Sequence, residues 1–302
     1  MNSSAASDLS ADGYAIFQAL DTATTSKYLD EFLNWRSIVN PTVPPHGVLK
    51  HYQIGHQPVA WKLRTTATIY TPFQKLLQAT DLVASFDGFG YLPKGTNRRN
   101  RPWHHIDQAP KDLSFQGVQG IVALTSNENA SFQCVPGSHN LVASYFEKCP
   151  AKYPSKRWQK LDLKHLNETL GTDLKTETIS LTAGELLIWD SRLIHQNAYD
   201  PNEERVVFYV SYRDRQGLSN TQATKRRRAF DEKRTTSHWA YPIELNPLQP
   251  QVWGDNSKLI DYNKMPQIKY SEELLRKIKS IFIRSDRPGY ALTRVRVDQG
   301  TR

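Results

Sequence analysis

The sequence predicts a mainly β fold with flanking helices, arranged as a sandwich or a barrel. From Leu82 onward the chain consists of short apolar runs broken by Gly, Pro, Asn and Asp, which is typical of strands joined by turns. Helical patterns occupy the first 80 residues and recur near the C-terminus. The 302 residues contain no internal repeat and no linker rich in Pro and Ser, so we expect a single domain, 1–302.

Helices are expected in the N-terminal part, residues 1–80, and near the C-terminus. Their apolar residues recur at three- and four-residue spacing, and Ser or Thr stands where each outermost helix begins. The dozen residues at the start are polar and expected to be loose. The expected helices cover about 26–38, 57–67, 71–79 and 271–283.

The β core is expected over residues 81–215, with one further strand near the N-terminus. Each expected strand is a short apolar run bounded by turn residues. Residues 140–175 interrupt the core as a polar insertion with two weak helical patterns, and they are a candidate lid. The expected strands are 13–17, 82–86, 118–124, 132–135, 178–181, 186–189 and 206–211.

The net charge of +9 lies almost entirely in a basic C-terminal extension, residues 216–302. That part holds 17 basic and 9 acidic side chains, and we expect it to pack on the core. Its densest run, Lys225–Arg228, is either a nucleic-acid or nuclear-targeting patch or a solvated helix face. Asp231 and Glu232 interrupt it, so we expect the run to be solvent-exposed and dispensable for catalysis.

Cysteine content and hydropathy indicate the compartment. Cys134 and Cys149 cannot form a disulfide framework or a cysteine zinc site. The N-terminus lacks the basic start and apolar core of a signal peptide, and no run of 18 apolar residues is present. We expect an intracellular, cytoplasmic protein that is neither secreted nor membrane-bound, and the basic run leaves a nuclear location open.

The segment Trp103-His104-His105-Ile106-Asp107 carries the strongest chemical signal. On a strand His105 and Asp107 point the same way, whereas His104 points to the opposite face. A second histidine, His195, follows the expected strand 186–189. Two imidazoles and one carboxylate form the ligand set of non-haem iron(II) oxygenases, which leaves positions open for substrate and O2. The alternative is a polar cluster satisfied within the protein.

Arg205 opens the next expected strand after His195. A guanidinium that enters a β-barrel interior needs an anionic partner, and a dicarboxylate cosubstrate offers a planar, bidentate one. The remaining histidines have no carboxylate at a useful spacing or lie in turns, so we interpret them as structural or surface residues. They are His46, His51, His56, His139, His165 and His238.

Together these residues resemble the phytanoyl-CoA dioxygenase family of Fe(II)/2-oxoglutarate-dependent oxygenases. The resemblance covers about residues 80–215 and implies a double-stranded β-helix, a cupin-like jelly-roll. One departure is the loop 127–131, which lacks the family's usual glycines. The matching segments are His105–Asp107, Gln119–Leu124, Pro136–His139, Gly184–Asp190 with His195, and Arg205.

The resemblance assigns roles to these positions. It places iron on the two histidines and the aspartate, and the distal carboxylate of 2-oxoglutarate on Arg205. It also implies that Asn197 assists and that Gln119 lies beside the other end of the cosubstrate. Candidates for the mouth of the substrate pocket are Trp103, Asp87 and Phe89.

The activity implied is hydroxylation of a C–H bond of a small organic molecule, with O2 consumed and succinate and CO2 released. One alternative is an oxygenase that acts on nucleic acid or another macromolecule, and a second is a catalytically silent jelly-roll that only binds. The C-terminus is not of the peroxisomal Ser-Lys-Leu type, which counts against an acyl-CoA role in that organelle. The sequence leaves the substrate and the oligomeric state open.

Overall fold

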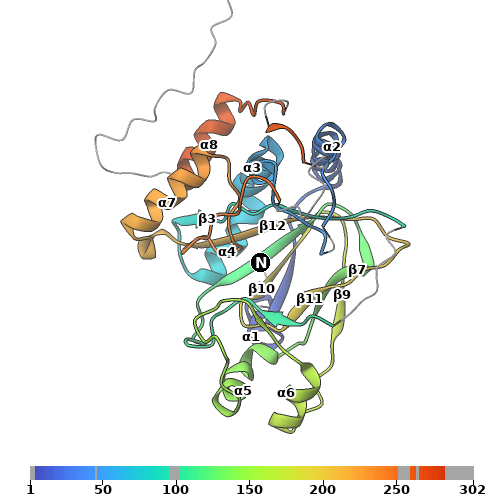
Figure 1. Ribbon diagram of the computed structural model, residues 1–302, viewed down its shortest axis with the longest axis vertical. Coiled ribbons are helices and arrows are strands. Elements are labelled where there is room, and N and C mark those ends of the chain that lie inside the picture. The colour runs from blue at the N-terminus through green and yellow to red at the C-terminus, as the bar shows by residue number, and fades with distance from the viewer. Residues whose placement is uncertain (1–3, 45, 96–101, 251–258, 263–264, 283–302) are drawn as a thin grey trace, which may run out of the picture.

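The computed structural model describes residues 4–44, 46–95, 102–250, 259–262 and 265–282. Two antiparallel sheets form the body of the molecule, and helices flank them (Figure 1). One sheet has seven strands in the order β1-β10-β6-β12-β4-β2, with β3 paired to β12, and the other has five in the order β8-β5-β11-β7-β9. This is the cupin-type jelly-roll with flanking helices that the sequence predicts.

The strands of the two sheets include every strand that the sequence predicts and several that it does not. The additional ones are mostly two to four residues long, too short to show a periodic pattern. The seven-stranded sheet contains β1 (Tyr14–Gln18), β2 (Val48–Leu49), β3 (Leu82–Ala84), β4 (Phe89–Leu92), β6 (Val118–Ala123), β10 (Glu185–Asp190) and β12 (Arg205–Asp214). The five-stranded sheet contains β5 (His105–Ile106), β7 (Asn127–Cys134), β8 (Gln159–Lys160), β9 (Glu177–Leu181) and β11 (His195–Asn197).

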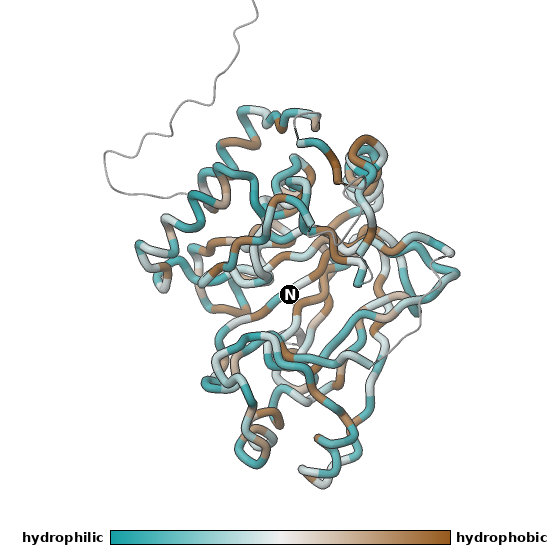
Figure 2. The backbone as a smooth tube through the Cα atoms, viewed as in Figure 1, coloured by the Kyte–Doolittle hydropathy of each residue, from teal (hydrophilic) through white to brown (hydrophobic). Residues whose placement is uncertain are grey.

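Strand alternation divides the core into two layers. On β6, Ile121 and Ala123 face the five-stranded sheet and pack with Phe132 and Cys134. The intervening Val122 faces the other way and packs beneath the helices. Figure 2 shows the apolar residues concentrated along the central strands and the hydrophilic ones at the periphery.

Three helices cover the outer face of the seven-stranded sheet: α2 (Thr22–Val39), α3 (Pro58–Thr65) and α4 (Ala67–Leu77). Helix α2 begins earlier than predicted, because the side chain of Asp21 accepts a hydrogen bond of 2.7 Å from the Thr24 amide and caps it. The prediction that the chain start is loose is wrong, since α1 (Ser4–Ala11) is helical there.

The insertion 140–175 does not form a lid with its helices. Helices α5 (Val142–Lys148) and α6 (Leu163–Leu170) lie together at the foot of the molecule (Figure 1). They share a small core with Ile106 and Ile194, which belong to the five-stranded sheet region. Only the segment Lys156–Trp158 of the insertion lines the main cavity described below.

The C-terminal part adds α7 (Asn220–Asp231) and α8 (Glu272–Phe282). Phe230 of α7 and Leu274 and Ile278 of α8 pack with Trp61 and Phe86 in a separate cluster. Short 3-10 turns lie at Ile54–His56, Ser138–Asn140 and Arg215–Gly217. No helix in the described ranges has the length and apolar character needed to cross a bilayer.

The prediction that Lys225–Arg228 is solvent-exposed is wrong at Arg226. This side chain is 1% exposed, donates 2.6 Å to the Ala240 carbonyl, and lies over the Phe86 ring at 4.6 Å. Four consecutive residues span a full helical turn, so one of them must face the protein. Arg228 on the outer side is exposed and pairs with Glu232.

Candidate metal centre

His105, Asp107 and His195 meet at one point between the sheets. Their ligand atoms all lie within 4.8 Å of one another, and all three residues are buried. The two histidines are direct partners across the adjacent strands β5 and β11. Nε2 of His105 lies 3.8 Å from Oδ1 of Asp107, and Nε2 of His195 lies 3.6 Å from Oδ2. The donor set is one that a transition metal accepts.

Backbone carbonyls orient both histidines toward this point. Nδ1 of His105 donates to the Trp103 carbonyl at 3.2 Å, and Nδ1 of His195 donates to the Leu193 carbonyl at 2.9 Å. Since a carbonyl can only accept, each Nδ1 carries the proton and each Nε2 keeps its lone pair. Burial lowers the pKa of each imidazole to about 3, so both are neutral at pH 7, the form that binds metal.

Aromatic rings and hydrogen bonds to the backbone hold the ligands in place. The Trp103 ring stacks on His105 with 4.8 Å between centroids, and Phe132 stacks on His195 at 5.5 Å. The backbone of Asp107 is held at both groups: its amide donates 3.0 Å to the Ser191 carbonyl, and its carbonyl accepts 3.0 Å from the Trp239 indole. The two-residue strand β5 therefore gains rigidity from its neighbours.

Arg205, the first residue of β12, lies on the same inner face as Tyr209. It is 2% exposed, and its Nη2 donates 2.9 Å to Oδ1 of Asn197, whose Nδ2 donates 3.1 Å to the Tyr209 hydroxyl. Within the described parts of the chain, Arg205 forms no ion pair with Asp or Glu. Because a buried cation without an anion is unfavourable, this guanidinium suits an anion that comes from outside the protein.

Gly90 makes room for that guanidinium. A Cβ at this position would lie 3.0 Å from Nη1 of Arg205 and 2.8 Å from the side chain of Val207. Both distances are shorter than ordinary contacts, so a larger residue on the neighbouring strand β4 would displace the Arg205 guanidinium or Val207 from its present position.

Gln119 on β6 is a further buried polar side chain of the inner face. It is 2% exposed, and neither its amide nitrogen nor its oxygen has a hydrogen-bond partner among the described residues. Its partner on the adjacent strand β10 is Trp189. The indole nitrogen of Trp189 likewise has no hydrogen-bond partner among the described residues. Buried amides of this kind call for an external partner, since nearly all others in proteins are satisfied.

A cavity of about 570 Å³ opens from the metal residues toward the surface. Its walls are rich in aromatic rings, and one wall comes from residues 236–246 of the C-terminal part. Trp103 and Asp87, two of the candidates for the pocket mouth, line this cavity. The aromatic lining consists of Trp103, Phe132, Trp158, Trp189, Tyr209 and Trp239.

The prediction that Phe89 lies at the mouth of the substrate pocket is wrong. It lies on the outer face of β4, is fully buried, and stacks on Phe32 of α2 at 4.7 Å and on Phe208 at 4.9 Å. Its place is the core beneath the helices, on the opposite side of the sheet from the cavity.

The interpretation of His238 as a histidine without a carboxylate is also wrong. Its Nδ1 lies 2.8 Å from Oδ1 of Asp87, and both residues line the cavity. The two are far apart in the sequence, so no local spacing reveals the pair. His104, by contrast, faces away as predicted and bonds to Thr176 at 2.9 Å.

The loop 127–131, which lacks the expected glycines, is part of β7. The Glu203 carboxylate accepts hydrogen bonds from the amides of Glu128, Asn129 and Ala130 at 3.1, 3.0 and 2.9 Å. One acidic side chain thus holds the irregular backbone, where a bulge interrupts the pairing with β9.

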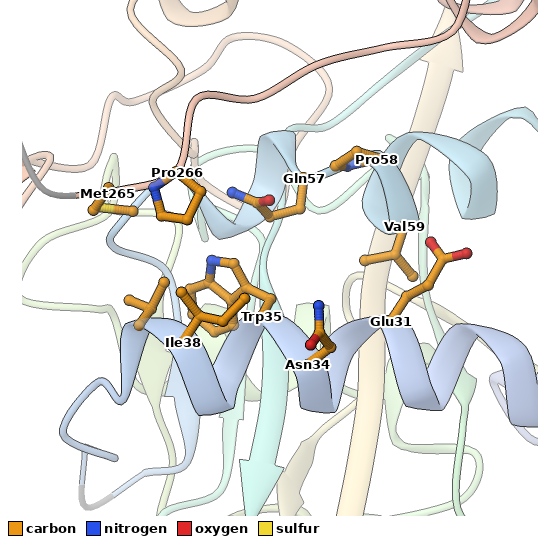
Figure 3. A pocket seen from close by; sticks show the side chains of 10 residues that line it. Glu31, Asn34, Trp35, Ile38, Gln57, Pro58, Val59, Met265 and Pro266 are labelled. Carbon is orange, nitrogen blue, oxygen red and sulfur yellow. The ribbon is translucent and has the colours of Figure 1, made fainter.

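A second cavity, of about 250 Å³, lies between α2 and α3 (Figure 3). Its wall is mainly apolar, with Trp35, Ile38 and Val59, and its carboxylate Glu31 pairs with Lys62 at 2.6 Å. It contains no histidine or cysteine, so the described structure gives it no metal chemistry.

No protein-family model matches this chain. A curated protein of Aspergillus versicolor, the Ava biosynthesis cluster protein O, is 23% identical over 164 residues, which is 51% of this chain and 53% of that protein. The match therefore spans about half the length of that relative.

Solved structures share the fold. The epimerase SnoN in complex with Fe3+, alpha ketoglutarate and nogalamycin RO is 19% identical with a TM-score of 0.51, covering 70% of this chain and 82% of that one. HygX from Streptomyces hygroscopicus with nickel, 2-oxoglutarate and hygromycin B bound is 14% identical with a TM-score of 0.51, covering 71% and 88%. GIG2 from Candida albicans is 13% identical with a TM-score of 0.57, covering 77% and 68%. At these identities the likeness establishes the fold.

Proposed function

We propose that this protein is an Fe(II)- and 2-oxoglutarate-dependent dioxygenase, similar to the phytanoyl-CoA dioxygenase family, that hydroxylates a C–H bond of a small organic molecule. One observation carries the proposal. The buried group His105–Asp107–His195 lies in the same inter-sheet interior as Arg205, a buried cation with no carboxylate partner in the described chain.

The two histidines and Asp107 would hold the iron as three ligands on one face, which leaves positions for cosubstrate and O2. With 2-oxoglutarate and O2, the bound iron would supply oxidation of a substrate C–H to C–OH together with release of succinate and CO2. The donor set fits, because both Nε2 atoms carry lone pairs and lie within 4 Å of a carboxylate oxygen. Similar folds hold Fe3+ or nickel with the same cosubstrate.

Arg205 would bind the distal carboxylate of 2-oxoglutarate. Asn197 fixes the guanidinium from one side and leaves its other N–H groups available for a planar, bidentate contact. Gln119 would donate and accept hydrogen bonds at the other end of the cosubstrate, which would satisfy its amide.

The remaining walls exclude water and receive the substrate. Trp103 and Phe132 cover the two histidine rings, so the reacting centre is shielded on the protein side. Asp87 and Trp103 stand on the substrate side of the cavity. The role of the protein in the chemistry is therefore positioning and protection, since no nucleophilic side chain is required.

Three observations favour a small molecule over a macromolecule. The cavity of about 570 Å³ has the size that small ligands occupy. The basic run is not a continuous surface patch, because Arg226 is buried. SnoN binds nogalamycin RO and HygX binds hygromycin B, both small molecules, and the relative from Aspergillus versicolor is named for a biosynthesis cluster.

The test is succinate release from 2-oxoglutarate by the iron-loaded protein, screened over a library of small molecules. We expect a substrate in the library to raise the rate of succinate release well above the rate measured without substrate. Asp107→Ala should release no succinate under either condition. Binding of iron and 2-oxoglutarate without turnover across the library would favour the silent jelly-roll. Strongly salt-dependent binding to DNA or RNA would favour the macromolecular oxygenase.

A further inference from the structure

Asp87 and His238 face each other on the wall of the main cavity, and His238 belongs to the segment 236–246 of the C-terminal part. Nδ1 of His238 lies 2.8 Å from Oδ1 of Asp87. Asp87 is 2% exposed and is held on its other oxygen by the Ser85 hydroxyl at 2.5 Å. Arg64 donates 2.6 Å to the Asp87 carbonyl, which fixes its backbone. The carboxylate is therefore a rigid support for the imidazole.

The imidazole of His238 remains open to the cavity. Its side chain is 41% exposed, and its ring packs against Tyr209 with 5.2 Å between centroids. With Nδ1 bonded to Asp87, Nε2 is left as the outward group, and it has no hydrogen bond to any described residue. A pair that only closed the fold would be enclosed, whereas this one presents a donor to the same cavity as the metal residues.

The charge state of His238 follows from its neighbours. Partial burial of the ring opposes the protonated form, but the charge of Asp87, its hydrogen bond and the charge of Asp107 outweigh that effect and raise the pKa of His238 to about 9. Both nitrogens are then protonated at neutral pH, so the outward group is a cationic N–H donor.

The rest of the cavity is also basic once the used carboxylates are set aside. Asp87 is paired with His238, and Asp107 belongs to the metal ligands. The charged residues that remain on the lining are Lys50, Lys156, Arg157 and Glu244. Three cations against one anion, with the His238–Asp87 pair neutral overall and its N–H donor facing the cavity, favour an anionic ligand.

We propose that His238, oriented by Asp87, binds an anionic group of the substrate. The substrate class is then a small organic acid whose apolar part packs against aromatic rings. His238 is then a specificity-determining residue, and the aromatic lining contacts the apolar part. The inference rests on the proposed function, because it names the substrate class of the same site.

The experiment uses two matched probes, 2-naphthoate and 2-naphthamide, which differ in charge and share a ring system. Binding is measured by calorimetry without O2, on protein loaded with iron(II) and saturated with 2-oxoglutarate, so that the naphthoate cannot occupy the cosubstrate position. We expect naphthoate to bind more tightly than naphthamide. His238→Gln should weaken naphthoate at least tenfold, about 1.4 kcal/mol, and leave naphthamide unchanged.

Further variants separate charge from shape. His238→Arg keeps a cation and should restore most of the preference for naphthoate, and Asp87→Asn should reduce it. His165→Gln is the matched control, because His165 bonds to Tyr145 at the foot of the molecule and should leave both affinities unchanged. The affinity for 2-oxoglutarate is measured in every variant.

Equal binding of the two probes, no binding of naphthoate to the parent protein, or an unchanged affinity in His238→Gln would each overturn the inference. A weaker affinity for 2-oxoglutarate in His238→Gln would overturn it too, because the imidazole would then face the cosubstrate. Failure of the proposed function looks different: the parent protein would not bind iron or 2-oxoglutarate before any probe is added.

Discussion

The two walls of the main cavity are built in different ways. The metal wall places His105, Asp107 and His195 on or beside paired strands, with exposed fractions of 5%, 8% and 5%. The opposite wall is a segment of little regular structure, in which an isolated bridge joins Thr236 to Leu245 and His238 is held through one side-chain pair. Strand pairing thus positions the metal ligands, whereas the C-terminal segment is placed by a few separate contacts, one of which is the hydrogen bond from the Trp239 indole to the Asp107 carbonyl.

Removal of one metal ligand should have the largest effect, and the loss should be in iron binding. We expect Asp107→Ala to weaken iron binding by two or more orders of magnitude, since the carboxylate is one of three ligands. Equilibrium dialysis against iron(II) measures this, with Asp173→Ala on the exposed surface as the control. If Asp107→Ala and His105→Ala bind iron as tightly as the parent, the ligand assignment is wrong.

Removal of the cosubstrate cation should act on 2-oxoglutarate and spare the iron. Arg205→Ala leaves a carboxylate without its charged partner, which typically costs ~2–5 kcal/mol, or about 1.5 to 3.7 orders of magnitude in affinity. Steady-state kinetics should show this as a raised KM for 2-oxoglutarate with unchanged iron binding. Arg228→Ala, an exposed arginine, is the control. Unaltered cosubstrate kinetics would mean that another residue holds the distal carboxylate.

The cavity wall formed by residues 236–246 can be destabilised without changing the metal ligands or Arg205. Arg226 donates to the Ala240 carbonyl, two residues beyond His238, so Arg226→Gln should destabilise the fold by about 1–3 kcal/mol. Thermal unfolding measures this as a Tm lower by several degrees. The triple variant Lys225→Gln, Arg227→Gln, Arg228→Gln should keep the parent Tm and a turnover within about twofold. Equal Tm values for the two variants would contradict the buried role of Arg226.

The smallest expected effect is on the pH dependence of naphthoate binding. Because the pKa of His238 is raised to about 9, its charge is present at pH 7 and is lost as the pH rises through that value. Naphthoate affinity should then be flat from pH 6 to 8 and fall above about 9. The other ionisable groups around His238 include Asp87, Asp107, Lys50, Tyr209 and Glu244, together with His105 and His195, which are neutral at these pH values.

Asp87→Asn provides the check on that pH profile. It removes the main support of the imidazolium, so the pKa of His238 should move back toward 6.5 and the affinity should fall earlier. Proton NMR of the histidine ring measures the pKa directly. A His238 pKa at or below its ordinary value in the parent protein would remove the electrostatic part of the inference.

The metal wall was predictable because its signals are local. Strand alternation pairs His105 with Asp107 in three residues, and Arg205 opens an apolar strand whose inner face follows from the same rule. Residues 85–88 lie outside any strand, so alternation does not carry from Asp87 to Phe89, and Phe89 packs beneath α2 while Asp87 lines the cavity. The Asp87–His238 pair depends on how the C-terminal segment folds back, and no sequence period records that.

The central claim is that one buried ligand set and one buried arginine together hold iron and 2-oxoglutarate. Equilibrium dialysis of labelled 2-oxoglutarate without O2, with and without iron(II), tests it most directly. We predict one iron and one 2-oxoglutarate per chain, cosubstrate binding that requires the metal, and loss of cosubstrate alone in Arg205→Ala. Binding of 2-oxoglutarate that is equally tight without metal, or that survives in Arg205→Ala, would contradict the account.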